Sequence, residues 1–232
     1  MRIAIMQPYL FPYIGYFQLI NAVDIFVIFD DVNFIKRGWI NRNRILVNGK
    51  EYMFVVPLKK ASQNKKIREI EITSDNKWRK RFLKTIEYHY KKATYFSNVM
   101  DLITRIINTK EINLSSFTHR SLILICEYLC IRTKIIDSSS KYQNEFLKAE
   151  KRIIDICKKE KADHYINPIG GLNFYRREDF SEHGIKLSFL KTKEIIYNQL
   201  SKPFVRNLSI IDVMMNNSIS SIRRMLNQYE LI

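Results

Sequence analysis

Two apolar runs separated by a stiff aromatic loop begin the chain, and they restrict the fold more than any other feature. Residues 2–6 have the length of a strand, residues 7–13 carry two prolines and several aromatic rings, and another apolar run begins near Ile14. The second strand candidate, residues 25–29, is apolar at every position, as is typical of a strand buried on both faces of a parallel sheet. The order strand, loop, helix, strand predicts an α/β fold with a site-bearing loop after the first strand.

The rest of the chain alternates helical and strand patterns. Asn48 and Gly49 predict a hairpin turn between strands at 44–47 and 51–56, because both residue types accept a positive φ. Helices are predicted at 99–108, 114–129, 145–159, 209–216 and 220–228, and strands at 131–137, 163–167 and 185–190. Ser209 is the expected N-cap of the first closing helix. We expect one α/β domain over residues 1–232, with a mainly parallel sheet flanked by helices, a β-hairpin, and a helical segment inserted at about 76–130.

A basic amphipathic helix is predicted from residue 76. Trp78, Phe82, Ile86 and Tyr90 fall four residues apart and form one apolar stripe, while lysine and arginine occupy the other faces. The net charge is +16, and residues 59–92 contribute half of it, with twelve basic against four acidic residues. Such a field suits a nucleoside diphosphate, an acidic carrier protein, the anionic inner membrane surface or nucleic acid. The alternative is a solubilising surface in a lysine-rich chain.

Composition favours a cytoplasmic protein. No apolar stretch has the length that spans a bilayer, and the apolar part of the N-terminus is too short for a signal peptide. Cys126, Cys130 and Cys157 are spaced for neither a disulfide framework nor a zinc ribbon, so we expect small buried side chains there. Walker-type, G-x-G-x-x-G, G-x-S-x-G and His-Glu-x-x-His motifs are absent, so the common nucleotide and hydrolase signatures give no guide.

An acidic pair, Asp30 and Asp31, follows the second strand directly. A half-buried carboxylate at a strand end has a raised pKa that suits a general base for an amine or hydroxyl. Asp31 and Asn33 also have the alternate spacing by which two oxygen ligands reach one Mg²⁺ or Mn²⁺. The third interpretation is structural, with Asp30 or Asp31 paired to Arg42 or Arg37. All three remain open from the residues alone.

A basic and aromatic segment follows the acidic pair. Guanidinium groups hold phosphate or carboxylate at two points, and Trp39 offers a stacking face for a base or a sugar. Gly38 permits close approach of the backbone. An anion-binding segment is therefore predicted, and its candidate side chains are Lys36, Arg37, Trp39, Asn41, Arg42 and Asn43.

Two further strand ends carry polar or flexible residues. The strand at 131–137 opens into a loop that begins with Ser138 and Ser139 and has room for a phosphate group. Gly170 and Gly171 follow the strand at 163–167, where paired glycines free backbone N–H groups for a ligand. Neighbouring candidates are Asn167, Tyr175 and His164, the last placed by its sequence position beside Tyr165 and the glycine pair.

Together these segments resemble the WbqC-like family, bacterial proteins often encoded with surface-polysaccharide genes. The resemblance is carried by residues 6–17, 24–33, 36–45, 57–64, 165–171, 197–199 and 208–213, in one order along the chain. Many members carry histidine where this chain has Met6, so a family role for that histidine is not transferred. The resemblance implies cell-envelope sugar metabolism and acyl or aminoacyl transfer to an amino sugar.

The preferred hypothesis is a cytoplasmic transferase of O-antigen or capsule synthesis that moves an acyl or aminoacyl group from a thioester donor to a nucleotide-linked amino sugar. Asp30 or Asp31 takes the amine proton, Gln7, Asn41 and N–H groups near Gly170 stabilise the oxyanion, and Lys36 and Arg42 bind the diphosphate. His164 is a further catalytic candidate, and Tyr13 and Gln199 complete the substrate-binding candidates. We expect no tightly bound cofactor and no metal ligand set, and the thioester acts as co-substrate.

A partner and two rival functions complete the sequence-based hypotheses. Lys80, Arg81 and Lys84 are natural docking charges for an acidic acyl carrier protein, and they allow weak association with the inner membrane surface. No specific nucleic acid is expected. The first rival is a metal-dependent glycosyltransferase that uses Asp31 and Asn33. The second is a non-enzymatic basic module that binds nucleic acid or an anionic membrane.

Overall fold

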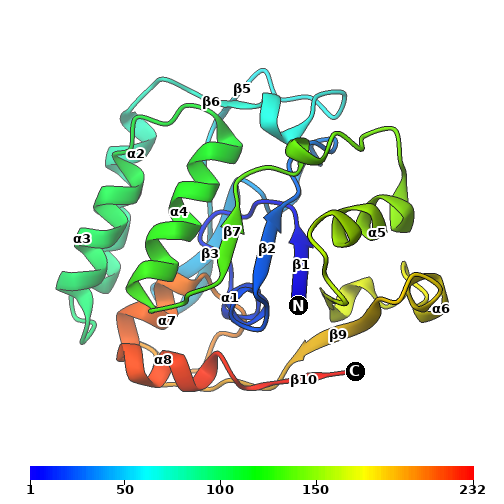
Figure 1. Cartoon of the computed structure of the whole chain (residues 1–232). Helices are drawn as coiled ribbons and strands as arrows, with labels where there is room; N and C mark the ends of the chain where they lie inside the picture. The colour runs from blue at the N-terminus through cyan, green and yellow to red at the C-terminus, as the bar shows by residue number, and fades with distance from the viewer.

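A sheet of six strands forms the centre of the computed structural model, which describes residues 1–232 (Figure 1). The strands lie in the order β10-β9-β8-β1-β2-β7. Five are parallel, and β10 runs antiparallel to β9 at one edge. Their bounds are β1 Arg2–Met6, β2 Ile25–Ile28, β7 Lys134–Ile136, β8 His164–Pro168, β9 Lys186–Thr192 and β10 Tyr229–Leu231. The predicted α/β class with a mainly parallel sheet is confirmed.

Both faces of the sheet are covered, which explains why β2 is apolar throughout. Phe26 and Ile28 belong to a core of 49 buried residues on one face, and Ile25 and Val27 belong to a core of 16 on the other. This alternation is the period of two expected for a strand. The larger core includes residues of α1 (Ile14–Asn21), and the smaller includes residues of α5 (Ala149–Lys159) and α6 (Arg177–Ser181).

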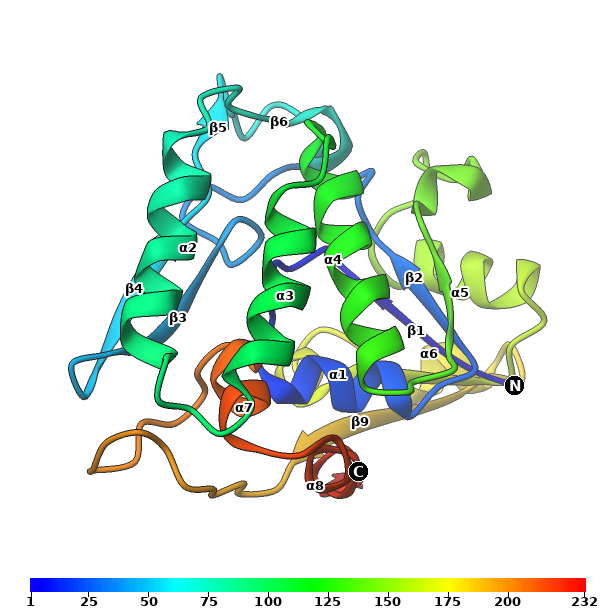
Figure 2. The same cartoon turned by 90° about the vertical axis from the view of Figure 1, so that its left-hand side faces the viewer.

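The middle of the chain adds a hairpin and three helices. Strands β3 (Arg42–Val47) and β4 (Lys50–Val55) flank Asn48 and Gly49, whose φ angles of 49° and 76° are the positive values that the turn requires. Helices α2 (Lys77–Tyr90), α3 (Phe96–Ile107) and α4 (Leu114–Tyr128) lie side by side (Figure 2). The predicted stripe of α2 is buried, and the hairpin, helices and sheet share the larger core.

The C-terminal helices fix the loop that follows β1. Ser209 caps α7 (Ile210–Asn216), as predicted, by accepting a bond from the N–H of Ile211. The Ser209 hydroxyl also donates to the carbonyl of Phe11 at 2.7 Å, and the N–H of Ile210 donates to the carbonyl of Pro12 at 2.8 Å. Helix α8 (Ile219–Met225) then leads to β10. The closing segment therefore holds the aromatic loop in one conformation.

Several short elements differ from the sequence-based prediction. Strand β10, the two-residue strands β5 (Leu58–Lys59) and β6 (Glu71–Ile72), and helix α6 were not predicted, because elements this short give little periodic signal. Three short 3₁₀ helices, η1 (Ile67–Glu69), η2 (Ser139–Tyr142) and η3 (Ile169–Gly171), lie in connecting segments. Every helix falls short of the combined length and apolar character that a bilayer crossing needs.

Candidate functional site

The strand order creates a topological switch point between β1 and β8. After β1 the chain moves to β2 and β7 on one side, and it then returns to β8 and β9 on the other. The strands β1, β2, β7 and β8 are parallel, and their carboxyl ends are followed by Gln7, Asp30, Ser138 and Ile169. The loops proposed from the sequence therefore share one edge of the sheet. In doubly wound folds this edge is where ligands bind.

Asp30 is buried at the end of β2 among neutral hydroxyl groups. Its Oδ2 accepts a bond from Ser115 of α4 at 2.6 Å, and its Oδ1 accepts one from Ser138 at 2.6 Å. Burial raises the pKa of Asp30, and the two serine hydroxyls only partly oppose that rise. No cation is paired with this carboxyl group. Asp30 therefore retains the character of a carboxylate that can accept a proton.

Asp31 has a different environment. Its side chain is fully buried in an ion pair with Arg152 of α5, and it also accepts a bond from Ser139. The guanidinium of Arg152 donates to Oδ1 of Asn144 at 3.0 Å and lies 4.7 Å from the ring of Phe29. The cation paired with Asp31 is thus Arg152, and the structural interpretation that paired Asp30 or Asp31 with Arg42 or Arg37 is wrong.

The sequence of α5 contained the only signal for this pairing. Arg152 is the single arginine of that helix, and it lies beside the apolar residues of the buried face.

The ion pair between Asp31 and Arg152 also bears on the metal hypothesis. Both carboxylate oxygens of Asp31 already accept bonds inside the chain, whereas Asn33 is exposed. No group of three or more His, Cys, Asp or Glu side chains is arranged to hold a metal ion.

The predicted anion-binding segment forms an aromatic and basic cluster around Trp39, whose residue is 42% exposed. The guanidinium carbons of Arg42 and Arg44 lie 5.5 Å and 5.3 Å from the Trp39 ring centroid, and the ring of Tyr9 lies 6.2 Å from it. Burial raises the pKa of Tyr9, and the charges of Arg44 and Arg42 oppose that rise. We name Tyr9, Trp39, Arg42 and Arg44 the Trp39 cluster.

Arg42 also organises the turn beside the cluster. Its Nε donates to the carbonyl of Gly38 at 2.8 Å, and its Nη2 donates to the carbonyl of Arg37. Arg37 adopts a φ of 59°, and Lys36 and Arg37 are exposed. The side chains of Lys36 and Arg37 are therefore open to a ligand, whereas Nε and Nη2 of Arg42 already donate to main-chain carbonyls.

Two asparagines of this segment support neighbouring backbone, Asn43 the loop after β1 and Asn41 the residue that follows β4. Asn43 is buried and donates to the carbonyl of Phe11 at 2.5 Å, and Asn41 donates to the carbonyl of Val56 at 2.8 Å. The main-chain carbonyl of Gln7 accepts a bond from Tyr16 at 2.8 Å, whereas the half-buried side-chain amide of Gln7 forms no bond within the chain. Gln7 is thus free to contact a ligand, and Asn41 and Asn43 act as supports.

The first turn of α1 lies under Tyr13. A side chain at Gly15 would overlap the ring of Tyr13, and its Cβ would stand only 2.7 Å from Oγ1 of Thr192 at the end of β9. Tyr13 is half-buried, and burial raises its pKa. The ring therefore covers a helix turn that only glycine accommodates.

The glycine loop after β8 divides into a packed half and an open half. Gly171 is buried against the side-chain amide of Asn167, whose Oδ1 accepts a bond from Tyr165 at 3.1 Å. Tyr175 packs on Tyr165 with ring centroids 6.0 Å apart. Gly170 borders open space, so its backbone is accessible to a ligand.

His164 does not share this edge. It is the first residue of β8, paired in register with Arg2, and so lies at the amino end of the strand, whereas the glycines follow the carboxyl end. Burial and the charges of Lys186 and Arg2 lower the pKa of His164. The predicted placement of His164 beside the glycine pair is wrong, because direction along a strand separates its two ends.

Gln199 belongs to a buried network that the sequence did not indicate. Asp212 of α7 accepts bonds from Tyr90 at 2.9 Å, Tyr197 at 2.7 Å and Gln199 at 3.0 Å. Burial raises the pKa of Asp212, and the three donors oppose that rise. The Tyr90 hydroxyl also accepts the N–H of Leu46 at 2.8 Å. The network therefore connects α2, the hairpin and the closing segment.

Comparison with known proteins identifies the family. The model of the WbqC-like protein family matches residues 7–224, a range that holds the candidate residues at the carboxyl edge of the sheet, the Trp39 cluster and the Asp212 network. The chain belongs to the WbqC-like protein family. The resemblance seen in the separate sequence blocks is thereby confirmed.

A relative has also been found among curated proteins. The uncharacterized protein Rv1507c of Mycobacterium tuberculosis is 32% identical over 218 residues, which is 93% of this WbqC-like chain and 93% of that protein. No solved structure matches the chain. Family membership is therefore shown over nearly the whole chain, and the reaction has to be argued from the site.

Proposed function

We propose that this WbqC-like protein is a cytoplasmic transferase of surface-polysaccharide synthesis. Its reaction moves an acyl or aminoacyl group from a thioester donor to the amine of a nucleotide-linked sugar at the carboxyl edge of the sheet. The observation that carries the proposal is the contrast between neighbouring carboxylates: Arg152 neutralises Asp31, while Asp30 has a raised pKa and no cation. A base of that kind suits removal of an amine proton near neutral pH.

The chemical step needs a base and an oxyanion site. The sugar amine attacks the thioester carbonyl, a C–N bond forms, and the proton of the ammonium passes to Asp30 as the tetrahedral intermediate collapses with loss of the thiolate. Asp30 then returns the proton to the thiolate. The free amide of Gln7 and the accessible backbone at Gly170 follow β1 and β8, on either side of the switch point, and we assign the oxyanion to them.

The Trp39 cluster supplies the binding surface for the nucleotide part. Trp39 offers a stacking face, and the unused part of the Arg42 fork carries positive charge beside it. Arg44 also packs on the ring, with its charge paired to Glu51 at 2.8 Å. Lys36 and Arg37 are exposed on the adjacent turn, where a diphosphate would meet them. The Trp39 cluster therefore fits an anion that is joined to a flat ring.

Asp30→Asn tests the proposal, with Asp101→Asn, an exposed acid on α3, as the matched control. Turnover of a nucleotide-linked amino sugar with an acyl thioester should fall by about 10²- to 10⁴-fold in Asp30→Asn and stay normal in the control. Binding of the nucleotide sugar, measured by the shift in melting temperature, should remain. Turnover within about threefold of wild type, less than ~1 kcal/mol of barrier, would remove Asp30 from the mechanism.

A further inference from the structure

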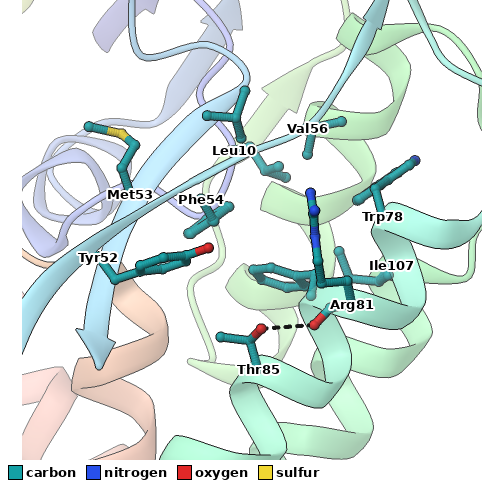
Figure 3. A pocket seen from close by; sticks show the side chains of 11 residues that line it. Leu10, Tyr52, Met53, Phe54, Val56, Trp78, Arg81, Thr85 and Ile107 are labelled. Atoms are coloured by element: carbon teal, nitrogen blue, oxygen red, sulfur yellow. Dashed lines mark hydrogen bonds between the residues drawn. The ribbon is translucent and has the colours of Figure 1, made fainter. Parts of the chain in front are cut away.

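A cavity of about 170 Å³ lies between strand β4 and helix α2 (Figure 3). Nine of its eleven lining residues are hydrophobic. They come from the loop after β1, from β4 and the residue that follows it, and from α2 and α3; the main walls are Leu10, Phe54, Val56, Trp78, Phe82 and Ile107.

Aromatic rings pack closely along one side of this cavity. The ring centroids of Phe54 and Phe82 lie 4.8 Å apart, and Phe11 stacks on Phe82 at 6.0 Å. Leu10 and Phe11 are fully buried, and their loop is held by Asn43 and Ser209. An engineered apolar cavity of about 150 Å³ binds benzene, so an apolar space of this size suits a six-carbon group.

One end of the cavity is positively charged. The side chain of Arg81 projects from α2 across the opening toward Val56, and its guanidinium forms no ion pair or hydrogen bond within the chain (Figure 3). The bond between Thr85 and Arg81 uses only the main-chain carbonyl of Arg81. The lining contains no carboxylate, and the Tyr52 hydroxyl over the same space has no partner. A ligand that fills the cavity and also pairs with the Arg81 charge is therefore apolar with an anionic end.

We propose that this cavity binds a short acyl chain of about six carbons whose oxygen-bearing end is held by Arg81. The proposal stands on the cavity and the unpaired guanidinium, and it holds whether or not the protein transfers acyl groups. Two sources share this chain: a free carboxylate, whose charge pairs with Arg81, and an acyl thioester, whose carbonyl oxygen lies at the same position.

Calorimetric titration with hexanoate tests the proposal on the whole protein, with fluorescence of Trp78 in the wall as a second readout. Hexanoate should bind about tenfold more tightly than butanoate, since each buried methylene contributes ~0.8 kcal/mol. Carboxylates with chains longer than eight carbons should bind no more tightly, because the cavity is then full. Equal affinity along the series, or no binding of hexanoate, would overturn the proposal.

Variants separate the charge from the cavity. Arg81→Gln is an exposed substitution that should weaken hexanoate at least tenfold and leave neutral hexanol unaffected. Lys77→Gln, one turn earlier on α2 and outside the lining, is the matched control and should leave both ligands unchanged. Val56→Phe should fill the cavity and remove binding of both ligands. Its melting temperature shows whether the variant is folded. Unchanged hexanoate affinity in Arg81→Gln would contradict the proposal even if Val56→Phe does not fold.

A final titration identifies the source of the chain. Tighter binding of hexanoyl-coenzyme A than of hexanoate, with coenzyme A alone as reference, shows that the site holds the acyl part of a thioester. Tighter binding of hexanoate shows a site for a free carboxylate. These measurements need no turnover, so a failed catalytic test of Asp30→Asn and a failed binding test give separate results.

Discussion

Replacing Arg152 with methionine should destabilise the protein strongly, because it leaves the carboxylate of Asp31 buried without a cation. The Asp31 side chain has 0% exposure and that of Arg152 has 7%, so water cannot replace the lost partner. Breaking a buried pair in this way costs about 3–5 kcal/mol.

The assay is urea unfolding at pH 7, followed by circular dichroism and tryptophan fluorescence, with exposed Arg105→Met on α3 as the control. The double variant with Asp31→Asn should be more stable than Arg152→Met alone. A loss below about 1 kcal/mol, as for an exposed ion pair, or a double variant no more stable than Arg152→Met, would show that Arg152 does not neutralise a buried Asp31.

Three further predictions concern other parts of the molecule. Cys130→Gly should stabilise the protein by about 1 kcal/mol in urea unfolding, because Cys130 has a φ of 57° just after α4, where glycine is favoured; a destabilised variant would contradict this. The difference in unfolding free energy between wild type and Asp212→Asn should shrink as the pH rises above 3.8. Burial raises the pKa of Asp212, so only the wild type bears the growing cost of a buried charge; a difference that widens with pH would contradict this. Changing Lys80 and Lys84 together to Glu should raise the Michaelis constant of a carrier-bound thioester at low salt and leave a small free thioester unaffected; an equal effect on both donors would reject carrier docking.

The elements predicted correctly are those whose evidence is local. The alternating burial of β2, the stripe of α2, the Asn48 turn and the Ser209 cap are each determined within a few residues of sequence. Period and turn chemistry act at that range, so the strands, the helices and the hairpin could be read before their arrangement was known.

The features that were missed depend on distant contacts. Arg152 lies 121 residues from Asp31, and Tyr90 lies 122 residues from Asp212, so no spacing pattern joins them. His164 was placed by its neighbours in sequence, and only the register of β8 against β1 shows that it lies at the other end of the strand. The separate environments of Asp30 and Asp31 likewise follow from α4 and α5, which deliver Ser115 and Arg152.

Mass spectrometry of a nucleoside diphosphate amino sugar incubated with an acyl thioester and the protein is the most direct test of the proposed transfer. We expect an amide product whose mass increases by the acyl group, formed by wild type and by Asp101→Asn and nearly absent with Asp30→Asn. No product with wild type across a set of amino sugars and thioesters, or an equal yield with Asp30→Asn, would contradict it.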